Sequence, residues 1–240
     1  MYKHILFDAD NTLLDFDQAE RSAFAQTMQT HRIPWDEAML SRYVHINKQL
    51  WLEFEQGKVN KETVQLQRFE TLLGSGFSSS DINHTFQQYL SAQAILMPYA
   101  REVCERLSQH AELSIVTNGV GATQRHKIKG SGLSPYFRHL FISEDIGFPK
   151  PDLRFFSHVL HELGRPDFAS VLIVGDSLTS DIQGGINAGI ATCWFNPGKA
   201  PVPPGYRVDY DIQSLYELEE IVFCSQPGYK SNRYELEYEA

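Results

Sequence analysis

Residues 4–14 of this 240-residue chain read HILFDADNTLL, and this stretch decides how the rest of the sequence is interpreted. Its apolar residues 5–7 predict a short buried strand. Asp8 and Asp10 follow that strand, and residues two apart point to the same side of an extended chain. Two carboxylates in one place repel each other unless a cation or a shared proton holds them. The pair therefore indicates either a solvated strand end or a catalytic site in which one acid attacks, one moves protons and a metal balances their charge.

Length and composition narrow the class of protein. With 42% hydrophobic residues the chain can form a substantial core, and 240 residues can hold one domain plus an insertion. No apolar run approaches the ~20 residues that cross a bilayer, and the first residues match no signal peptide. The cysteines are odd in number and widely spaced, which predicts reduced thiols and a cytoplasmic location: Cys104, Cys193 and Cys224. A net charge of −9 argues against a nucleic-acid partner. We expect no membrane partner, and a monomer or a small homo-oligomer.

The spacing of apolar residues divides the chain into two regions. After the first strand, helices are expected at 17–31, 35–54, 61–73 and from an Asp81 cap to Leu96. Beyond Pro98, expected helices alternate with expected strands: helices at 99–109, 121–130, 152–163 and 179–188, and strands at 113–116, 139–142, 171–174 and 190–194. This alternation is typical of an α/β fold with a doubly wound parallel sheet. We predict an α/β core from residues 1–16 and 98–222, an inserted all-helical cap domain at 17–97, and a peripheral tail at 223–240.

Polar residues follow the expected strands at the edge where an open α/β sheet binds its ligands. The first strand is followed by Asp8 and Asp10, the second by Thr117-Asn118-Gly119, and a later one by Gly175-Asp176-Ser177. Each group alone has an ordinary explanation, because β-branched residues favour strands and aspartate favours turns. Together they gather carboxylates, a hydroxyl and main-chain amides around one point.

Two further charged residues are expected at the same edge. Lys150 lies between Pro149 and Pro151 just before a helix, and Asp181 lies near the first turn of the helix that follows Asp176. Lys150 could be a solvated loop charge, and Asp181 could stabilise a helix N-terminus by about 0.3–1 kcal/mol. Since independent explanations would not place all these residues at one edge of one sheet, we interpret them as one site.

In this order and spacing, the motifs resemble those of the haloacid dehalogenase-like hydrolases, in the subgroup with a helical cap after the first strand. The resemblance covers residues 1–222 and rests on four segments: residues 8–12, residues 117–119, Lys150-Pro151, and Gly175-Asp176 with Asp181. It implies an enzyme, a Mg²⁺-dependent phosphatase that hydrolyses phosphate monoesters through an aspartyl-phosphate intermediate.

The resemblance also implies a role for each acidic residue. Asp8 would be the nucleophile, and Asp10 would protonate the leaving group and then activate water. Mg²⁺ would be bound by Asp8, Asp176 and the main-chain carbonyl of Asp10. Asp181 would anchor Lys150 or a metal-bound water.

Phosphate binding is assigned in the same way. Thr117 and the amides near Asn118 and Gly119 would bind phosphate oxygens, together with Lys150, which would also neutralise charge on the nucleophile. The residues expected to be catalytic are Asp8, Asp10, Thr117, Lys150 and Asp181.

Other activities of the same superfamily remain as alternatives. Dehalogenases typically lack an acid at the position of Asp10, so dehalogenation is disfavoured. A phosphomutase keeps both acids, and these residues do not exclude one. A non-catalytic binding domain would have lost at least one of Asp8, Asp10, Lys150 and Asp176.

The expected cap carries the information on the leaving group. Residues 45–51 (HINKQLW) and 65–70 (QLQRFE) resemble the YjjG-type pyrimidine 5′-nucleotidases, and residues 143–147 and 185–194 agree with that subgroup. The resemblance implies a small phosphate monoester as substrate, a pyrimidine nucleotide such as dUMP, dTMP, UMP or a non-standard analogue. A sugar phosphate is the alternative. Candidate residues for base or sugar contact are Phe16, Asn47 and Trp51, although Trp51 could equally be part of the cap core.

Overall fold

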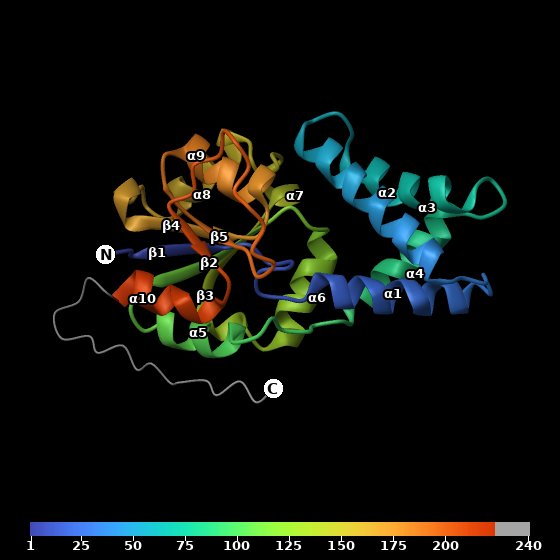
Figure 1. The fold of residues 1–240 in the computed structure, drawn as a ribbon, viewed down its shortest axis with the longest axis horizontal. Coiled ribbons are helices and arrows are strands. Elements are labelled where there is room, and N and C mark those ends of the chain that lie inside the picture. Colours follow the sequence, from blue (N-terminus) through green and yellow to red (C-terminus); the bar gives the residue numbers. More distant parts are fainter. Residues whose placement is uncertain (224–240) are drawn as a thin grey trace.

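The computed structural model describes residues 1–223, in which helices cover both faces of a parallel β-sheet and a further group of helices lies beside it (Figure 1). The sheet has six strands in the order β3-β2-β1-β4-β5-β6, and every neighbouring pair is parallel. The strands are β1 (His4–Phe7), β2 (Glu112–Thr117), β3 (Phe137–Ile142), β4 (Val171–Gly175), β5 (Ala191–Phe195) and β6 (Tyr210–Ile212). The prediction of a doubly wound α/β fold is confirmed.

Strand β1 lies at the centre of this sheet and determines where the site forms. Phe7 is in register with Ile115 of β2 on one side and with Val174 of β4 on the other. The carboxyl ends of β1, β2 and β4 therefore meet at one edge, and the residues that follow them are neighbours.

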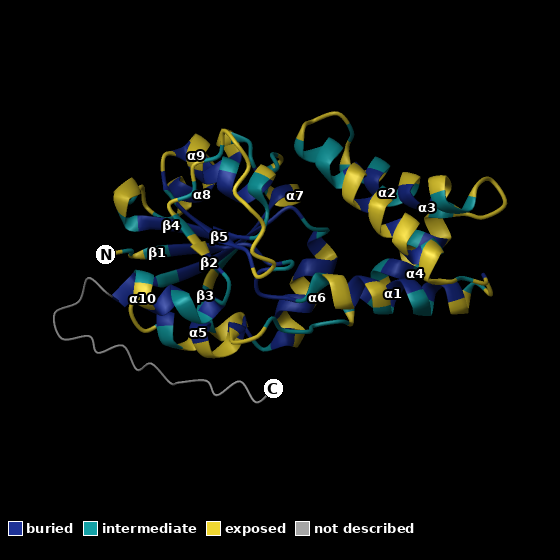
Figure 2. Ribbon diagram, in the orientation of Figure 1, coloured by how far each residue is buried: buried dark blue, intermediate teal, exposed yellow. Residues whose placement is uncertain are grey.

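Each face of the sheet has its own layer of helices. Ile5 and Phe7 face a core with α5 (Ala100–Leu107), α6 (Gly121–Ser131) and α10 (Leu218–Phe223), whereas Leu6 faces α8 (Leu153–Glu162) and α9 (Gln183–Ala188). This alternation follows from the two-residue period of a strand. The strands β1, β2, β4 and β5 are correspondingly almost entirely buried (Figure 2). Phe223 is buried in the first of these cores, one residue beyond the predicted core boundary.

The remaining helices form the cap, which we define as α1 (Phe16–Thr30), α2 (Glu37–Glu55), α3 (Lys61–Leu73) and α4 (Ser79–Ser91). It has a separate hydrophobic cluster centred on Phe24, Tyr43, Phe69 and Phe86. Its outward helix faces are exposed (Figure 2). The chain enters and leaves the cap side by side, since Leu14 bridges Leu96.

Three expectations about local structure were wrong or incomplete. Helix α4 is capped by Ser78, whose hydroxyl accepts from the Asp81 main-chain N–H, and it ends at Ser91 rather than Leu96. The chain at 95–97 is extended because the main chains of Ile95 and Met97 bond to the segment that follows β1. Strand β6 was not predicted, because its three residues are too short to show a period.

The structure bears on two of the three cysteines and on the expected absence of a membrane-spanning segment within residues 1–223. Cys104 and Cys193 are buried free thiols, and Cys224 lies, with the predicted tail from 224 onward, outside the described residues. Within residues 1–223, no helix combines the length and the apolar character that spanning a bilayer requires.

The cap cluster can be tested by one substitution and its matched control. Phe24 is fully buried against the rings of Trp35 and Tyr43, whereas Phe77 is 45% exposed in the turn before α4. Phe24→Ala should lower the free energy of unfolding by about 3–5 kcal/mol, because it leaves a cavity. Phe77→Ala should lower it by less than about 0.5 kcal/mol. Chemical denaturation measures both values, and equal losses would contradict this description of the cap.

Candidate functional site

Three carboxylates converge at the carboxyl edge of the sheet. Asp8 follows β1, Asp176 follows β4, and Asp181 lies in the π-helical turn Leu178–Ile182. One oxygen atom from each lies within 4.8 Å of the others. Asp8 and Asp181 are buried and Asp176 is partly exposed, so the group opens to solvent on one side.

The Lys150 ammonium holds two of these carboxylates. Nζ donates to Asp8 Oδ1 and to Asp181 Oδ1, each at 2.6 Å, and to the Val116 carbonyl at 2.9 Å. The side chain is 1% exposed, and all three ammonium protons are used. Burial lowers the pKa of Lys150, but the carboxylates of Asp181 and Asp8 more than reverse this, so the lysine stays charged.

The position of Lys150 depends on Asn118. The Asn118 amide donates to the Lys150 carbonyl at 2.9 Å, and its Oδ1 accepts from the Lys150 main-chain N–H at 2.9 Å. The side chain of Asn118 therefore holds the loop before α8.

The charge of the cluster is not balanced by protein groups. Burial, and then the neighbouring carboxylates, raise the pKa of Asp8 to about 7 against the opposing effect of Lys150. Burial, with Asp8 and Asp181, also raises the pKa of Asp176 well above its ordinary value. Three carboxylates with one ammonium leave a deficit of positive charge, and carboxylate oxygens are the ligands that hard divalent cations prefer. The donor set therefore fits such a cation.

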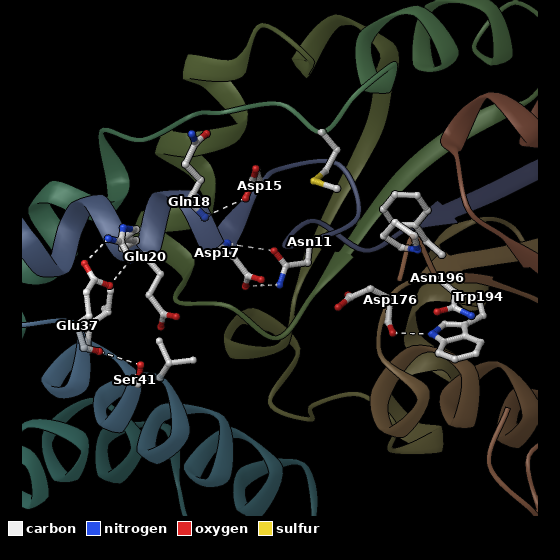
Figure 3. A pocket seen from close by; sticks show the side chains of 16 residues that line it. Asn11, Asp15, Asp17, Gln18, Glu20, Glu37, Ser41, Asp176, Trp194 and Asn196 are labelled. Carbon is white, nitrogen blue, oxygen red and sulfur yellow. Dashed lines mark hydrogen bonds and ion pairs between the residues drawn. The ribbon is translucent and has the colours of Figure 1, made fainter. Parts of the chain in front are cut away.

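Glycine and tryptophan residues shape the Asp176 end of the cluster. A Cβ at Gly175 would lie 2.2 Å from Asp181 Oδ2, so only glycine lets Asp181 approach the end of β4. The Thr12 hydroxyl accepts from the Asp176 main-chain N–H at 3.1 Å. Trp194 Nε1 donates to the Asp176 carbonyl at 2.8 Å (Figure 3). These contacts fix the main chain of Asp176 and leave its carboxylate facing the cluster.

The segment after β2 supplies hydrogen-bond donors. Thr117 Oγ1 accepts from the Gly119 main-chain N–H at 3.0 Å, which leaves the hydroxyl proton available to an incoming oxygen. Lys61, from the start of cap helix α3, donates to the Gly119 carbonyl at 2.9 Å and to Ser143 Oγ at 3.1 Å. Burial lowers the pKa of Lys61.

The Asp10 side chain lies outside the three-carboxylate cluster. Its Oδ1 accepts from Lys127 Nζ and its Oδ2 from Gln124 Nε2, both on α6. Lys127, which is 1% exposed, was not predicted as a site residue, because most of α6 is polar and a lysine in such a helix is ordinarily solvated. The available signal was the spacing of three residues, which places Gln124 and Lys127 on one helix face.

A cavity of about 480 Å³ connects the carboxylates with the cap. All sequence-predicted site residues line it: Asp8, Asp10, Thr117, Asn118, Gly119, Lys150, Asp176 and Asp181 from the core, and Phe16, Asn47 and Trp51 from the cap side. A groove lined by Asn11, Asp17, Glu20, Asp176 and Trp194 adjoins it (Figure 3).

The cap wall of the cavity contains a buried polar network. Asn47 Nδ2 donates to Glu20 Oε1 at 2.6 Å, and Asn47 Oδ1 accepts from Arg68 Nη1 at 3.1 Å. The Arg68 guanidinium lies 4.6 Å from the centre of the Phe86 ring. The Asn47 amide is thereby held in one orientation. Trp51 packs edge-on against Phe54 at 5.6 Å and still lines the cavity.

Comparisons with known proteins agree with this geometry. Residues 2–189 match the family model of haloacid dehalogenase-like hydrolases. The chain belongs to this family.

Curated relatives cover nearly all of the chain. The HAD-hydrolase YfnB of Bacillus subtilis is 38% identical over 92% of this chain and 95% of its own length. Pyrimidine 5′-nucleotidase PynA of Streptococcus pneumoniae is 36% identical over 92% and 99%, and pyrimidine 5′-nucleotidase YjjG of Escherichia coli is 33% identical over 91% and 96%. A crystal structure of YfnB bound to magnesium superposes with a TM-score of 0.88, covering 92% of this chain and 99% of that one. The chain has both Asp8 and Asp10 and is similar to these relatives over nearly its whole length. It is therefore a phosphatase, a hydrolase of phosphoric monoesters.

In this phosphatase, the buried Glu20 of the cap should make the free energy of unfolding depend on pH. Burial raises the Glu20 pKa from 4.5 to about 7, partly opposed by Arg68 and reinforced by Asp17. Between these values the folded state binds a proton that the unfolded state releases, so stability falls as pH rises through this window. Glu20→Gln should remove up to about 3 kcal/mol of that dependence.

The measurement is the free energy of unfolding of both proteins at several pH values from 4.5 to 7.5. Other buried carboxyls titrate equally in both, so the difference between the two curves isolates Glu20. Parallel curves would contradict a raised pKa at this residue.

Proposed function

We propose that this phosphatase is a Mg²⁺-dependent 5′-nucleotidase that acts on pyrimidine nucleoside monophosphates. The observation that carries the proposal is the bridge from Lys150 to Asp8 and Asp181 at 2.6 Å each, at the core end of a cavity whose other wall is the cap. At about 480 Å³ the cavity falls within the ~300–1,000 Å³ range of small-molecule sites.

In the first step, the Asp8 carboxylate attacks phosphorus and the bond from phosphorus to the 5′-oxygen breaks. Asp10, in its protonated form, transfers its proton to that oxygen, so the nucleoside leaves as an alcohol. In the second step, Asp10 takes a proton from water as the water oxygen attacks phosphorus. The bond to Asp8 breaks, inorganic phosphate leaves, and both acids return to their starting states.

The other core residues bind and neutralise the phosphoryl group. The Thr117 hydroxyl and the main-chain amide of Asn118 donate to its oxygens, while the Gly119 N–H orients Thr117 by donating to its Oγ1. Lys150 reduces the repulsion between the phosphate dianion and Asp8. Asp181 fixes Lys150. Asp8, Asp176 and the Asp10 carbonyl would hold Mg²⁺, which supplies positive charge at the transferring phosphoryl group.

The cap residues suit a flat, amide-containing leaving group. Phe16 and Trp51 offer aromatic faces to a base, and Asn47 keeps one amide proton beyond its bond to Glu20. The relatives PynA and YjjG, named as pyrimidine 5′-nucleotidases, support this choice of substrate. A sugar phosphate has no planar base to stack on these aromatic faces.

Phosphate release from a panel of nucleoside monophosphates and sugar phosphates tests the substrate. With Mg²⁺ present, kcat/KM should be highest for dUMP, dTMP or UMP, and removal of the metal with EDTA should abolish turnover until Mg²⁺ is restored. Activity confined to sugar phosphates would overturn the substrate while leaving the phosphatase chemistry in place. Full activity in EDTA would overturn the dependence on metal.

A substitution of the nucleophile tests the chemistry. Asp8→Asn should lower kcat by at least about a thousandfold, because the amide cannot form the intermediate. Circular dichroism should show a folded protein. Asp167→Asn, which changes an exposed aspartate before strand β4, is the matched control and should retain activity. Comparable activity of the two variants would refute the assignment of Asp8.

A further inference from the structure

Helix α6 contributes two buried side chains that the mechanism above does not use. Lys127 and Gln124 both end on the Asp10 carboxylate, one on each oxygen. Their side chains come from one helix face, and both residues are almost completely buried, at 1% and 2% exposure. Asp10 is therefore held from both sides by groups fixed in the core.

The residues around Lys127 hold its ammonium group against the Asp10 carboxylate. Its Nζ lies 5.3 Å from the centre of the Phe16 ring, at the start of cap helix α1. A buried ammonium is costly unless it is paired and hydrogen-bonded, so its salt bridge to Asp10 confines the lysine to this position. The same salt bridge restricts the position of the Asp10 side chain.

Gly119 keeps space for the second contact. A Cβ at this position would lie 2.1 Å from Gln124 Nε2 and 2.8 Å from Gln124 Cδ. A side chain there would displace Gln124 from Asp10, so the segment proposed to bind phosphate also leaves room for the contact from Gln124 to Asp10.

We propose that Lys127 and Gln124 are positioning residues, which hold Asp10 where it exchanges its proton with the leaving oxygen; this rests on the proposed function. A carboxylate has about four acceptor sites, so two contacts leave a free site on each oxygen, and in the protonated form of Asp10 the proton occupies one of these free sites while both contacts remain. The Asp10 side chain remains 25% exposed and lines the cavity, so that free site is accessible to substrate. Without these contacts, Asp10 gains rotational freedom and its proton is misplaced.

The dependence of the rate on the leaving group distinguishes positioning from a structural role. An alkoxide needs the proton of Asp10 to depart, whereas p-nitrophenolate is a stable anion and departs without it. The value of kcat/KM covers the steps up to transfer to Asp8. Asp10 activates water only after that transfer, so this second role does not affect kcat/KM. Lys127→Met is compared with Lys129→Met, which changes an exposed lysine of the same helix.

For Lys127→Met we expect kcat/KM to fall about a hundredfold on the best pyrimidine nucleotide and less than about tenfold on p-nitrophenyl phosphate. Lys129→Met should match the wild type on both substrates. Equal losses on both substrates, or no loss on either, would overturn the proposal. If Lys127→Met does not fold, Gln124→Leu is measured instead. It should show the same selectivity with a smaller loss, and equal losses would again overturn the proposal.

The proposed substrate can be wrong without affecting the role proposed for Lys127. If the wild type releases no phosphate from pyrimidine nucleotides, the proposed function is wrong in its substrate. The comparison then uses the alkyl phosphate that the wild type hydrolyses best, and the selectivity ratio still decides whether Lys127 positions Asp10.

Discussion

The buried ammonium of Lys150 is the interaction on which the site depends. It lies between Asp8 and Asp181 and makes a third bond to the Val116 carbonyl, so it joins the ends of β1, β2 and the turn after β4. Carboxylates this close would repel one another without it. Removing one partner from a buried ion pair leaves an uncompensated charge, which is far more costly than loss of an exposed pair. The doubly wound topology is what brings these strand ends to one point.

Although the protein is acidic overall, three lysines lie together at the site. The chain carries a net charge of −9, yet Lys150, Lys127 and Lys61 all end at the carboxyl edge of the sheet. Each has a separate location: Lys150 on Asp8, Lys127 on Asp10, and Lys61, from the cap, on the segment after β2. Each of these lysines is paired with a carboxylate, so together they offset part of the negative charge at this edge of the sheet. Lys61 also means that the cap contributes directly to the shape of that segment.

The sequence predicts features that rest on short-range patterns. The apolar run before Asp8, the strands before Thr117 and Asp176, and the glycine at 175 all carry local signals, and their topology follows from the alternation of strands and helices. Spacing places Gln124 and Lys127 on one helix face but does not show that Lys127 is buried, because its burial depends on Phe16 from a distant helix and on Asp10 across 117 positions. The orientation of Asn47 likewise depends on Glu20 and Arg68, which lie on two other cap helices. Short elements such as β6 are determined by tertiary pairing.

The central claim is that Asp8, held by Lys150, receives the phosphoryl group. The most direct test uses the Asp10→Asn variant with p-nitrophenyl phosphate and Mg²⁺, since this substrate needs no acid to leave but the intermediate still needs a base for its hydrolysis. Rapid quenching, borohydride reduction and peptide mass spectrometry then locate any acyl phosphate, which is reduced to an alcohol. The account predicts homoserine in place of Asp8 while other carboxyl groups stay unchanged. Nitrophenol release with an unmodified Asp8, or with reduction at another carboxyl group, would contradict it.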